Sequence, residues 1–417
     1  GFADTLMIGH HTMPELAAAS FVNSIFTLVF VFSLGFCNGI TPIVGSHYGR
    51  GETQRITDVL KNSLVTALML TVILSVVLLA VYLNLGNLGQ PEELVPLMRP
   101  YLLLQMISLP FVIYFNTMKQ FSDGMLHTRT GMWIVLAGNL LNILGNWLLI
   151  YGHWGLPELG LQGAGLSTLI SRIVMTLLFV AVLTLQPTYQ GLRNHWKKAR
   201  VNRADFMRLN KMGWPLALQM GMETAAFNLS AIIVGWIGVT ALAANQILTI
   251  TSQFCYFISS GMAVATSIRV SLFYGQKDEE GVRRSVHTGF ALVLLLLLMT
   301  AIVVLALRWR IGGWFTDNAE VSRLVALSII PLLVYQFSDG MQNTYANALR
   351  GLSEVKLLVP IAFLAYFVVC LPMAYLLAIP CAWGLQGIWW AYLFGLSIAA
   401  VLYFAVYRRA MRKKFAR

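Results

Sequence analysis

Long apolar runs constrain the fold of this chain more than any other feature of its sequence. A helix needs roughly 20 mainly apolar residues to cross the hydrocarbon core of a bilayer, and eleven runs approach or exceed that length. They lie at 16–45, 59–85, 101–118, 132–150, 161–185, 214–238, 242–267, 289–307, 324–348, 357–379 and 385–407. Only 11% of the residues are charged and the mean hydropathy is +0.71. These values exclude an ordinary soluble domain and predict an all-α integral membrane protein.

The first nine residues are apolar but too short to span a bilayer, and the sequence does not begin with Met. We expect residues 1–9 to be the end of a first helix whose beginning is not included. The intact protein would then have twelve transmembrane helices, eleven of them complete here.

The two halves of the sequence repeat one another. Residues 4–49 align without a gap on residues 230–275, and more distant matches follow further along both halves. The matched pairs are Gly9 with Gly235, Leu16-Ala17-Ala18 with Leu242-Ala243-Ala244, Gly35 with Gly261, Tyr48-Gly49 with Tyr274-Gly275, Pro110 with Pro331, Tyr114 with Tyr335, and Gly160 to Gly163 with Gly384 to Gly387. Transporters are commonly built from such repeats, with binding sites near the bilayer midplane.

The repeat predicts two pseudo-symmetric lobes of six helices each. We expect an N-terminal lobe at 1–186, with its first helix incomplete, and a C-terminal lobe at 209–407. A basic cytoplasmic linker at 187–208 would join the lobes, and a basic cytoplasmic tail would follow at 408–417.

The distribution of basic residues predicts the orientation in the membrane. If the connections alternate between the two sides, 23 of the 29 Lys and Arg fall on one side. The positive-inside rule assigns this side, with the C-terminus and the missing N-terminus, to the cytoplasm, so we expect a multi-pass protein of the inner (plasma) membrane. The net charge of +12 then reflects orientation and contact with anionic lipid, and no nucleic-acid partner is expected.

Two carboxylates lie deep inside apolar segments of the second half. Glu223 is the only charged residue between Lys211 and Arg269, and Asp339 is the only one between Arg323 and Arg350. A charge at the centre of a membrane helix costs roughly 2.5 to 3.5 kcal/mol on insertion scales, so it usually serves ion handling, proton relay or substrate binding. The alternative is an acid paired with a neighbour for packing alone.

Other polar residues share faces with these acids. Tyr335 and Asn343 lie one helical turn before and after Asp339, and Gln219 lies one turn before Glu223. If the two faces meet, they form a cavity that can hold a proton or a hard cation. The alternative is ordinary interhelical hydrogen bonding.

A second candidate cation site lies in the first half. Asp4, Asn142, Asn146 and Thr168 all fall within apolar stretches, and the two asparagines are one helical turn apart. A set of oxygen ligands suits a weakly bound monovalent cation better than zinc or copper. The alternative is that these residues only join helices, as Asn and Thr often do in membranes.

Soft and aromatic side chains near Glu223 suggest a substrate surface for flat lipophilic cations, which bind aromatic faces. Arg172 is expected at mid-membrane depth, where it could pair with an acid such as Asp4, extend toward the interface or stabilise helix contacts. The candidates for the substrate cavity are Gln219, Met222, Phe227, Phe254, Tyr256, Asn343 and Arg172. For most of the aromatic residues, a core or lipid-facing position is the alternative.

Several kinds of chemistry are not supported by motifs. The chain has no Gly-x-x-x-x-Gly-Lys-Ser/Thr phosphate loop and no His-Glu-x-x-His, and its four cysteines have no paired spacing. We therefore expect no enzymatic activity, no cofactor and no transition metal. Energy for transport would come from an ion gradient.

With these motifs in view, the sequence resembles the multidrug and toxic compound extrusion (MATE) transporters over nearly its whole length, and is most similar to their NorM branch. The most specific motifs are residues 1–5 with Gly9, residues 16–18, 45–51, 138–146 and 160–164, Glu223 after Pro215, and Tyr335 to Asp339. The loop at 45–51 also lacks the Gly-x-x-x-Asp-Arg pattern of major-facilitator carriers.

The resemblance implies a V-shaped monomer of two six-helix lobes that exports organic cations in exchange for Na⁺ or H⁺. By resemblance, Glu223, Tyr335 and Asp339 form the cation site of the second lobe, and the first-half site corresponds to the cation site of the first lobe. Proton-driven members more often carry Asp at the position of Asn146, so this departure weakens a purely proton-driven mechanism in the first lobe.

Two other functions stay open at this point. A flippase for lipid-linked oligosaccharides would share the architecture, but it would need a basic central cavity, for which Arg172 is the only candidate. A membrane-embedded enzyme could use Glu223 and Asp339 as acid and base, and would form product without a gradient.

Overall fold

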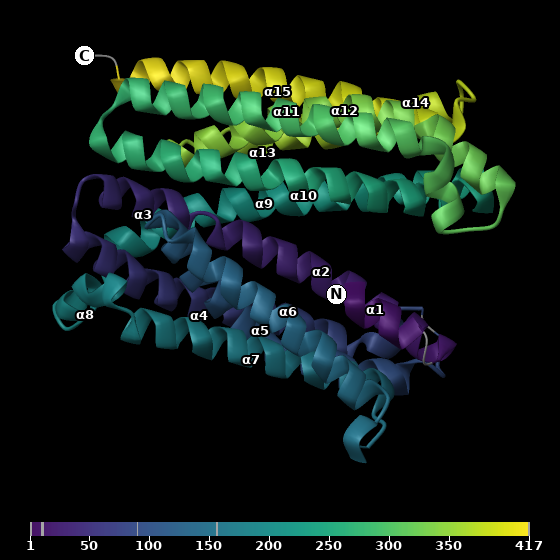
Figure 1. The fold of residues 1–417 in the computed structure, drawn as a ribbon, viewed down its shortest axis with the longest axis horizontal. Coiled ribbons are helices and arrows are strands. Elements are labelled where there is room, and N and C mark those ends of the chain that lie inside the picture. Colours follow the sequence, from purple (N-terminus) through teal and green to yellow (C-terminus); the bar gives the residue numbers. More distant parts are fainter. Residues whose placement is uncertain (1, 10–11, 90, 156, 416–417) are drawn as a thin grey trace. The chain divides into compact units, whose positions relative to one another are not determined.

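The computed structural model describes residues 2–9, 12–89, 91–155 and 157–415, and all the regular structure in these ranges is helical. The chain forms two compact units, unit 1 at Gly1–Ala217 and unit 2 at Leu218–Arg417 (Figure 1). Eleven helices or helix runs among the described residues are long and apolar enough to cross a membrane. The prediction of an all-α, multi-pass membrane protein is therefore confirmed.

Unit 1 is built mainly from long helices that pack against α5. Its helices are α1 (Phe2–Gly9), α2 (Met13–Cys37), α3 (Ile40–Gly49), α4 (Thr53–Leu83), α5 (Val95–Gly124), α6 (Thr128–Ile150), α7 (Gly160–Leu185) and the short α8 (Gln190–Trp196), with 3₁₀ turns at Leu85–Asn87, His153–Gly155 and Pro187–Tyr189. Helix α5 contacts α2, α3, α4, α6 and α7. A buried apolar cluster that includes Leu70, Tyr101 and Leu109 fills the space between them.

Unit 2 contains the rest of α9, which starts in unit 1, and the helices that follow. They are α9 (Arg203–Ile237), α10 (Val239–Gln276), α11 (Glu279–Ile311), α12 (Ala319–Gly351), α13 (Leu358–Phe363), α14 (Leu371–Ala378) and α15 (Gly384–Phe415), with a 3₁₀ turn at Gly312–Trp314. A π-helical stretch, η5 (Leu364–Cys370), joins α13 to α14 within one span. Pro372 near the start of α14 lacks the N–H that a regular α-helical turn would use, which favours a wider turn before it.

Side chains in the sequence define where these helices begin. Thr12 accepts a hydrogen bond from the Glu15 amide at the start of α2, and Asp278 accepts one of 2.9 Å from the Gly281 amide at the start of α11. Asn318 accepts from the amides of Glu320 and Val321 at the start of α12. Such caps satisfy the amides that have no partner in the first helical turn.

The sequence repeat falls on equivalent helix boundaries. Helices α7 and α15 begin at the paired Gly160 and Gly384, whose φ angles of 53° and 55° lie in the left-handed region that favours glycine. Just before them, the amides of Leu159 and Trp383 each donate 3.0 Å hydrogen bonds, to the carbonyls of Leu149 and Leu377. Both halves therefore start this helix from a glycine in the same left-handed conformation, although the preceding connections differ in length.

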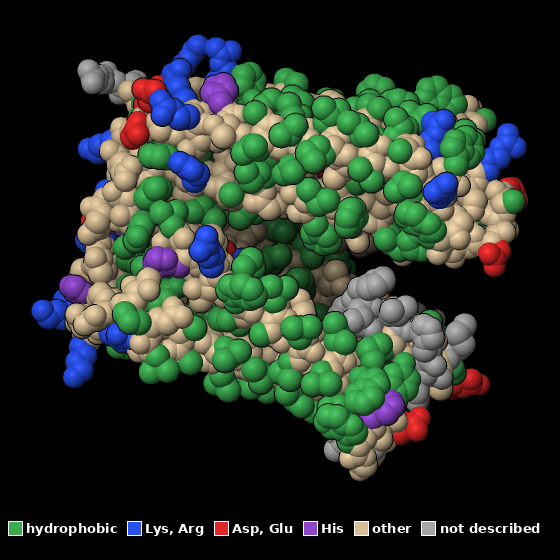
Figure 2. All heavy atoms as spheres, in the orientation of Figure 1, with side chains coloured by type: hydrophobic (Ala, Val, Ile, Leu, Met, Phe, Trp, Pro, Cys, Tyr) green, Lys and Arg blue, Asp and Glu red, His purple; other side chains and the backbone are tan. Residues whose placement is uncertain are grey.

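Most Lys and Arg side chains lie at one end of each unit, which we call its basic end, and a smaller group lies at the opposite end of unit 2 (Figure 2). In unit 1 the region predicted as a linker packs onto α4 at this end. The Lys61 ammonium donates to the Ala199 carbonyl at 3.1 Å, and the Asp58 carboxylate accepts from the Arg200 amide at 2.9 Å. The Asn62 side chain accepts from the Asn202 amide at 3.1 Å, so the segment is fixed to unit 1 over several residues.

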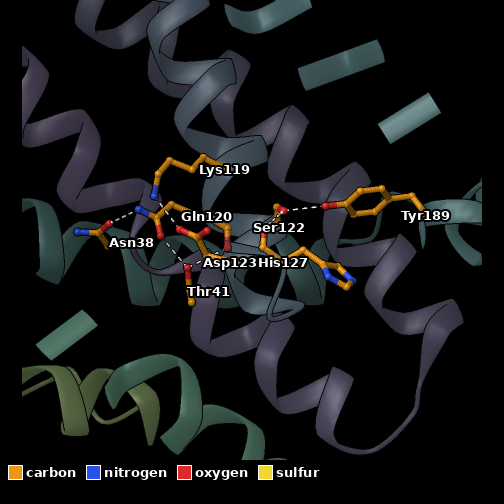
Figure 3. Close-up of polar contacts among 8 residues, drawn as sticks. All are labelled: Asn38, Thr41, Lys119, Gln120, Ser122, Asp123, His127 and Tyr189. Atoms are coloured by element: carbon orange, nitrogen blue, oxygen red, sulfur yellow. Dashed lines mark hydrogen bonds and ion pairs between the residues drawn. The ribbon is translucent and has the colours of Figure 1, made fainter. Parts of the chain in front are cut away.

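A polar network ties the break between α2 and α3 to the end of α5 (Figure 3). Gln120 donates to Asn38 at 2.6 Å and accepts from Thr41 at 2.7 Å. On the same helix, Asp123 forms a 2.7 Å ion pair with Lys119. This pairing within one helix end is consistent with a structural role for Asp123.

The short connection between α3 and α4 has a pH-dependent contact. A hydrogen bond of 2.5 Å from the His47 Nδ1 lowers the pKa of the partly exposed Glu52 below its ordinary value of 4.5, against a smaller opposing effect of burial. A carboxylate whose pKa is lowered in the folded state stabilises the fold above its unfolded pKa and loses this effect as the pH falls through its folded pKa. We expect Glu52→Gln to lower the free energy of unfolding by about 1 kcal/mol at pH 7, because the partly exposed Glu52 pairs with a buried His47 and solvent screens part of the interaction.

Chemical unfolding of the wild type and Glu52→Gln at pH 7 and at a pH below the folded pKa of Glu52 checks this prediction. The difference between the two proteins should disappear at the lower pH. A difference of the same size at both pH values would contradict it.

Candidate functional site

The two acids predicted from the sequence come together in unit 2. Glu223 lies on α9 and is half-buried, while Asp339 lies on α12 and is 4% exposed. Their carboxylates are close enough to interact electrostatically. Two nearby acids inside apolar helices can share a proton or bind a cation, because a positive charge relieves their mutual repulsion.

Tyr335 is held by α10 and does not hydrogen-bond to Asp339. Its hydroxyl forms a hydrogen bond with Ser252, and the Gln336 amide donates to the hydroxyls of Ser252 and Tyr335 at 2.9 and 3.2 Å. Tyr335 lies one helical turn before Asp339 on α12, and the two groups interact electrostatically. Ser252 and Gln336 were not predicted from the sequence.

An aromatic cluster lies beside the acids in unit 2. The ring centroids of Phe227 and Tyr392 are 4.7 Å apart, and Tyr335 lies 5.5 Å from Trp389 and 5.6 Å from Tyr392. The predicted candidates Met222 and Phe227 pack against the buried core of this unit.

The other aromatic candidates, both on α10, have different surroundings. Tyr256 interacts electrostatically with both Glu223 and Asp339. Phe254 is 65% exposed, and none of the interactions described around the two acids includes it. The structure thus brings Tyr256, but not Phe254, next to the acids.

Arg350 is a buried residue of this region that the sequence interpretation missed. It is only 9% exposed, donates to Gln219 at 3.1 Å and interacts electrostatically with Glu223. Arg350 was counted only among the basic residues of the predicted cytoplasmic side, and Arg172 was the one arginine named for a basic cavity, so the buried Arg350 adds a second arginine to consider. Its spacing of eleven residues from Asp339, three helical turns on the same face, could have indicated its position.

The first-half candidates also meet, as two pairs on α1, α6 and α7 of unit 1. The Asn146 side chain donates to the Asp4 carboxylate at 2.5 Å, and Asn142 donates to the Thr168 hydroxyl at 3.2 Å. The side-chain oxygen of Asn146 is buried and accepts no hydrogen bond from the described residues. This oxygen and the Asp4 carboxylate are the kind of ligands that a monovalent cation uses.

Arg172 lies on α7 and is fixed to α5. It donates to Gln105 at 2.7 Å and to the hydroxyl of Ser108, and its guanidinium lies 4.7 Å from the ring centroid of Phe26. It also interacts electrostatically with Asp4. Of the three roles that the sequence allows, helix contact and interaction with Asp4 fit these contacts.

Comparison with known sequences identifies relatives along the whole chain. The MatE family model matches residues 1–148 and 215–376. A protein named Multidrug resistance protein NorM from Photobacterium profundum is 30% identical over 413 residues, covering 96% of this chain and 89% of the relative. Another of that name, from Vibrio vulnificus (strain YJ016), is 31% identical over 412 residues with the same coverage.

Solved structures share the fold. A crystal structure of MATE in the straight conformation matches with a TM-score of 0.91 at 18% identity, covering 100% of this chain and 92% of the other. The outward-facing conformation of a multidrug resistance MATE family transporter matches with a TM-score of 0.89 at 19% identity and the same coverage. The resemblance that the sequence motifs suggested is confirmed: the chain belongs to the MATE family of membrane transporters.

Proposed function

We propose that this protein exports organic, cationic, lipophilic compounds by alternating access in exchange for Na⁺ or H⁺. The observation that carries the proposal is the electrostatic interaction of Glu223 with Asp339 inside apolar helices, beside an aromatic cluster. The names of the NorM relatives support drug-like molecules as substrates. Aromatic faces next to carboxylates are suited to flat organic cations.

Coupling follows from competition for the same negative charge. When Glu223 and Asp339 are ionised, they attract a substrate cation toward unit 2. When Na⁺ or a proton binds there, this attraction is neutralised and the substrate is released. A ligand drives a change of state only through different affinities for the two states, so this competition is what links the two fluxes.

Asp4, Asn142, Asn146 and Thr168 are proposed as a second cation site, within unit 1. We also propose that the protein acts as a monomer in the inner membrane with its basic ends and its C-terminus on the cytoplasmic side, in line with the positive-inside rule. Substrate would then be taken from the cytoplasm or the inner leaflet.

Uptake of ethidium by inverted vesicles containing the protein tests the proposal. The uptake is driven in turn by an outward-directed Na⁺ gradient and an outward-directed proton gradient, with vesicles lacking the protein as control. Uptake dependent on either ion supports antiport and identifies the coupling ion. No uptake with either gradient would contradict it and would favour the oligosaccharide flippase, for which Arg172 and Arg350 supply buried positive charge.

Substitution of Asn146 tests the proposed cation site of unit 1. In Asn146→Asp, a second carboxylate would lie within hydrogen-bonding distance of Asp4, and the pair would hold a proton because two such close acids cannot both be charged. We expect the proton-driven share of ethidium uptake to rise severalfold relative to the Na⁺-driven share.

Asn84→Asp is the matched control, because it makes the same chemical change on an exposed residue at the end of α4, outside the proposed cation site. It should change the ratio of the two driving ions less. Equal ratios in the wild type and Asn146→Asp would argue against a cation site at Asp4.

A further inference from the structure

Arg350 carries a buried positive charge without an ion pair. It lies in the last turn of α12 and is 9% exposed, yet no carboxylate of the described residues lies within 4.0 Å of its guanidinium. Its Nε is buried and has no hydrogen-bond partner among the described residues. Removing a charge from water without a close counter-ion is costly, so its retention here calls for a compensating interaction.

The direct partners of Arg350 are neutral. Its guanidinium donates to the side-chain oxygens of Gln219 at 3.1 Å and Asn347 at 3.4 Å. Asn347 in turn donates to Asn343 at 2.8 Å, so amide groups extend from Arg350 along α12 toward Asp339. These contacts hold the guanidinium in place without neutralising it.

Other groups that face Arg350 are phenols and the acid of α9. It interacts electrostatically with Tyr256 of α10, Tyr403 of α15 and Glu223. Gln219, which binds Arg350, lies one turn before Glu223 on the same helix, so the guanidinium is held beside this carboxylate. With Asp339, the two acids and the guanidinium carry a net charge of −1 when the acids are ionised, and one monovalent cation makes the group neutral.

We propose that Arg350 is a tethered counter-ion for Glu223, which stabilises the empty acid pair after the coupling ion has left and so limits how tightly that ion is held. This role rests on the proposed function of the acid pair. Without the guanidinium, two carboxylates would face each other in an apolar site and would retain their cation strongly. With it, the ion can leave and the site can accept a substrate cation.

Removal of the positive charge tests this role in the vesicle assay, with the coupling ion that the assay identifies. In Arg350→Gln we expect the half-saturating concentration of that ion to fall about tenfold, which corresponds to about 1.4 kcal/mol, while the maximal rate of ethidium uptake also falls. A slower rate together with tighter ion binding is not expected from a purely structural role. Arg350→Lys, which keeps the charge, should give a half-saturating concentration near that of the wild type.

A second variant tests the same role if Arg350→Gln does not fold, and a third serves as a control. Asn347→Asp places a carboxylate beside the guanidinium and should draw it away from Glu223, again lowering the half-saturating ion concentration. Arg269→Gln removes an exposed arginine of α10, which lies over Phe273, and should not change it.

The outcomes separate this role from the proposed function. If the wild type shows no ion-dependent uptake, the proposed function fails and the role of Arg350 fails with it. If the wild type is ion-dependent but Arg350→Gln and Asn347→Asp leave the half-saturating concentration unchanged or raise it, only the counter-ion role is overturned.

Discussion

Asp339→Asn is expected to lower the initial rate of ion-driven ethidium uptake about 100-fold while the protein still folds and inserts. Two unit charges about 6 Å apart at an effective dielectric constant of about 20 interact by about 3 kcal/mol, and this attraction for a cation is lost when the acid becomes an amide. The amide has nearly the same shape, so packing around this buried side chain is kept. Loss of a like charge next to Glu223 should leave the fold at least as stable.

Asp317→Asn is the matched control, because it makes the same chemical change on an exposed residue. Its uptake rate should equal that of the wild type. Glu223→Gln should behave like Asp339→Asn, since the two acids are proposed to act as one site. Full export in both Asp339→Asn and Glu223→Gln, at normal expression, would refute the proposed role of this acid pair.

Gly163→Ala is expected to destabilise the protein strongly. A Cβ atom at Gly163 of α7 would overlap the Leu149 carbonyl group of α6, with its carbon only 2.6 Å away, and one at the repeat-related Gly387 of α15 would lie 2.8 Å from the Leu377 carbonyl carbon of α14. Backbone cannot move aside as a side chain can. Overpacking of this kind costs about 1 to 3 kcal/mol or more, so both variants should show a lower thermal unfolding temperature in detergent, Gly163→Ala the lower of the two.

Another repeat-related pair of glycines gives the control. A Cβ at Gly35 would lie 2.8 Å from the Ala217 Cα, whereas one at Gly261 would meet no atom within 4 Å. Gly261→Ala should therefore keep or slightly raise stability, because alanine favours the helix by up to about 1 kcal/mol, and Gly35→Ala should lower it. Equal effects of Gly163→Ala and Gly261→Ala would show that the close helix approach at Gly163 is not what requires glycine.

Part of the acid site could be predicted because it depends on residues close together along one helix. The cost of burying Glu223 and Asp339 can be read from their apolar surroundings, and the helical period places Tyr335 on the face of Asp339. The period does not say which neighbouring helix that face meets. The Tyr335 hydroxyl forms its hydrogen bond with Ser252 of α10, which is more than eighty residues away in the chain and could not be predicted from the period.

The charge pattern predicted a side of the membrane for Arg350 but not its environment. Its position near the end of an apolar span fits a residue at the membrane surface, and basic residues at such positions usually extend into water. Packing of α12 against α10, α11 and α15 encloses it instead. Burial is a property of all the neighbouring helices together, and a single apolar span carries no information about them.

The sequence by itself determined the membrane class, the helical spans, the internal repeat and the two acids, because hydropathy, helical period and turn residues act over short stretches of chain. The matched turns at Gly160 and Gly384 belong to this local level. Only the tertiary structure decided that Asn146 binds Asp4, that Arg172 is fixed to α5 and that Arg350 lies beside Glu223. These contacts join residues far apart in sequence, and they exist only once the helices of each unit have packed.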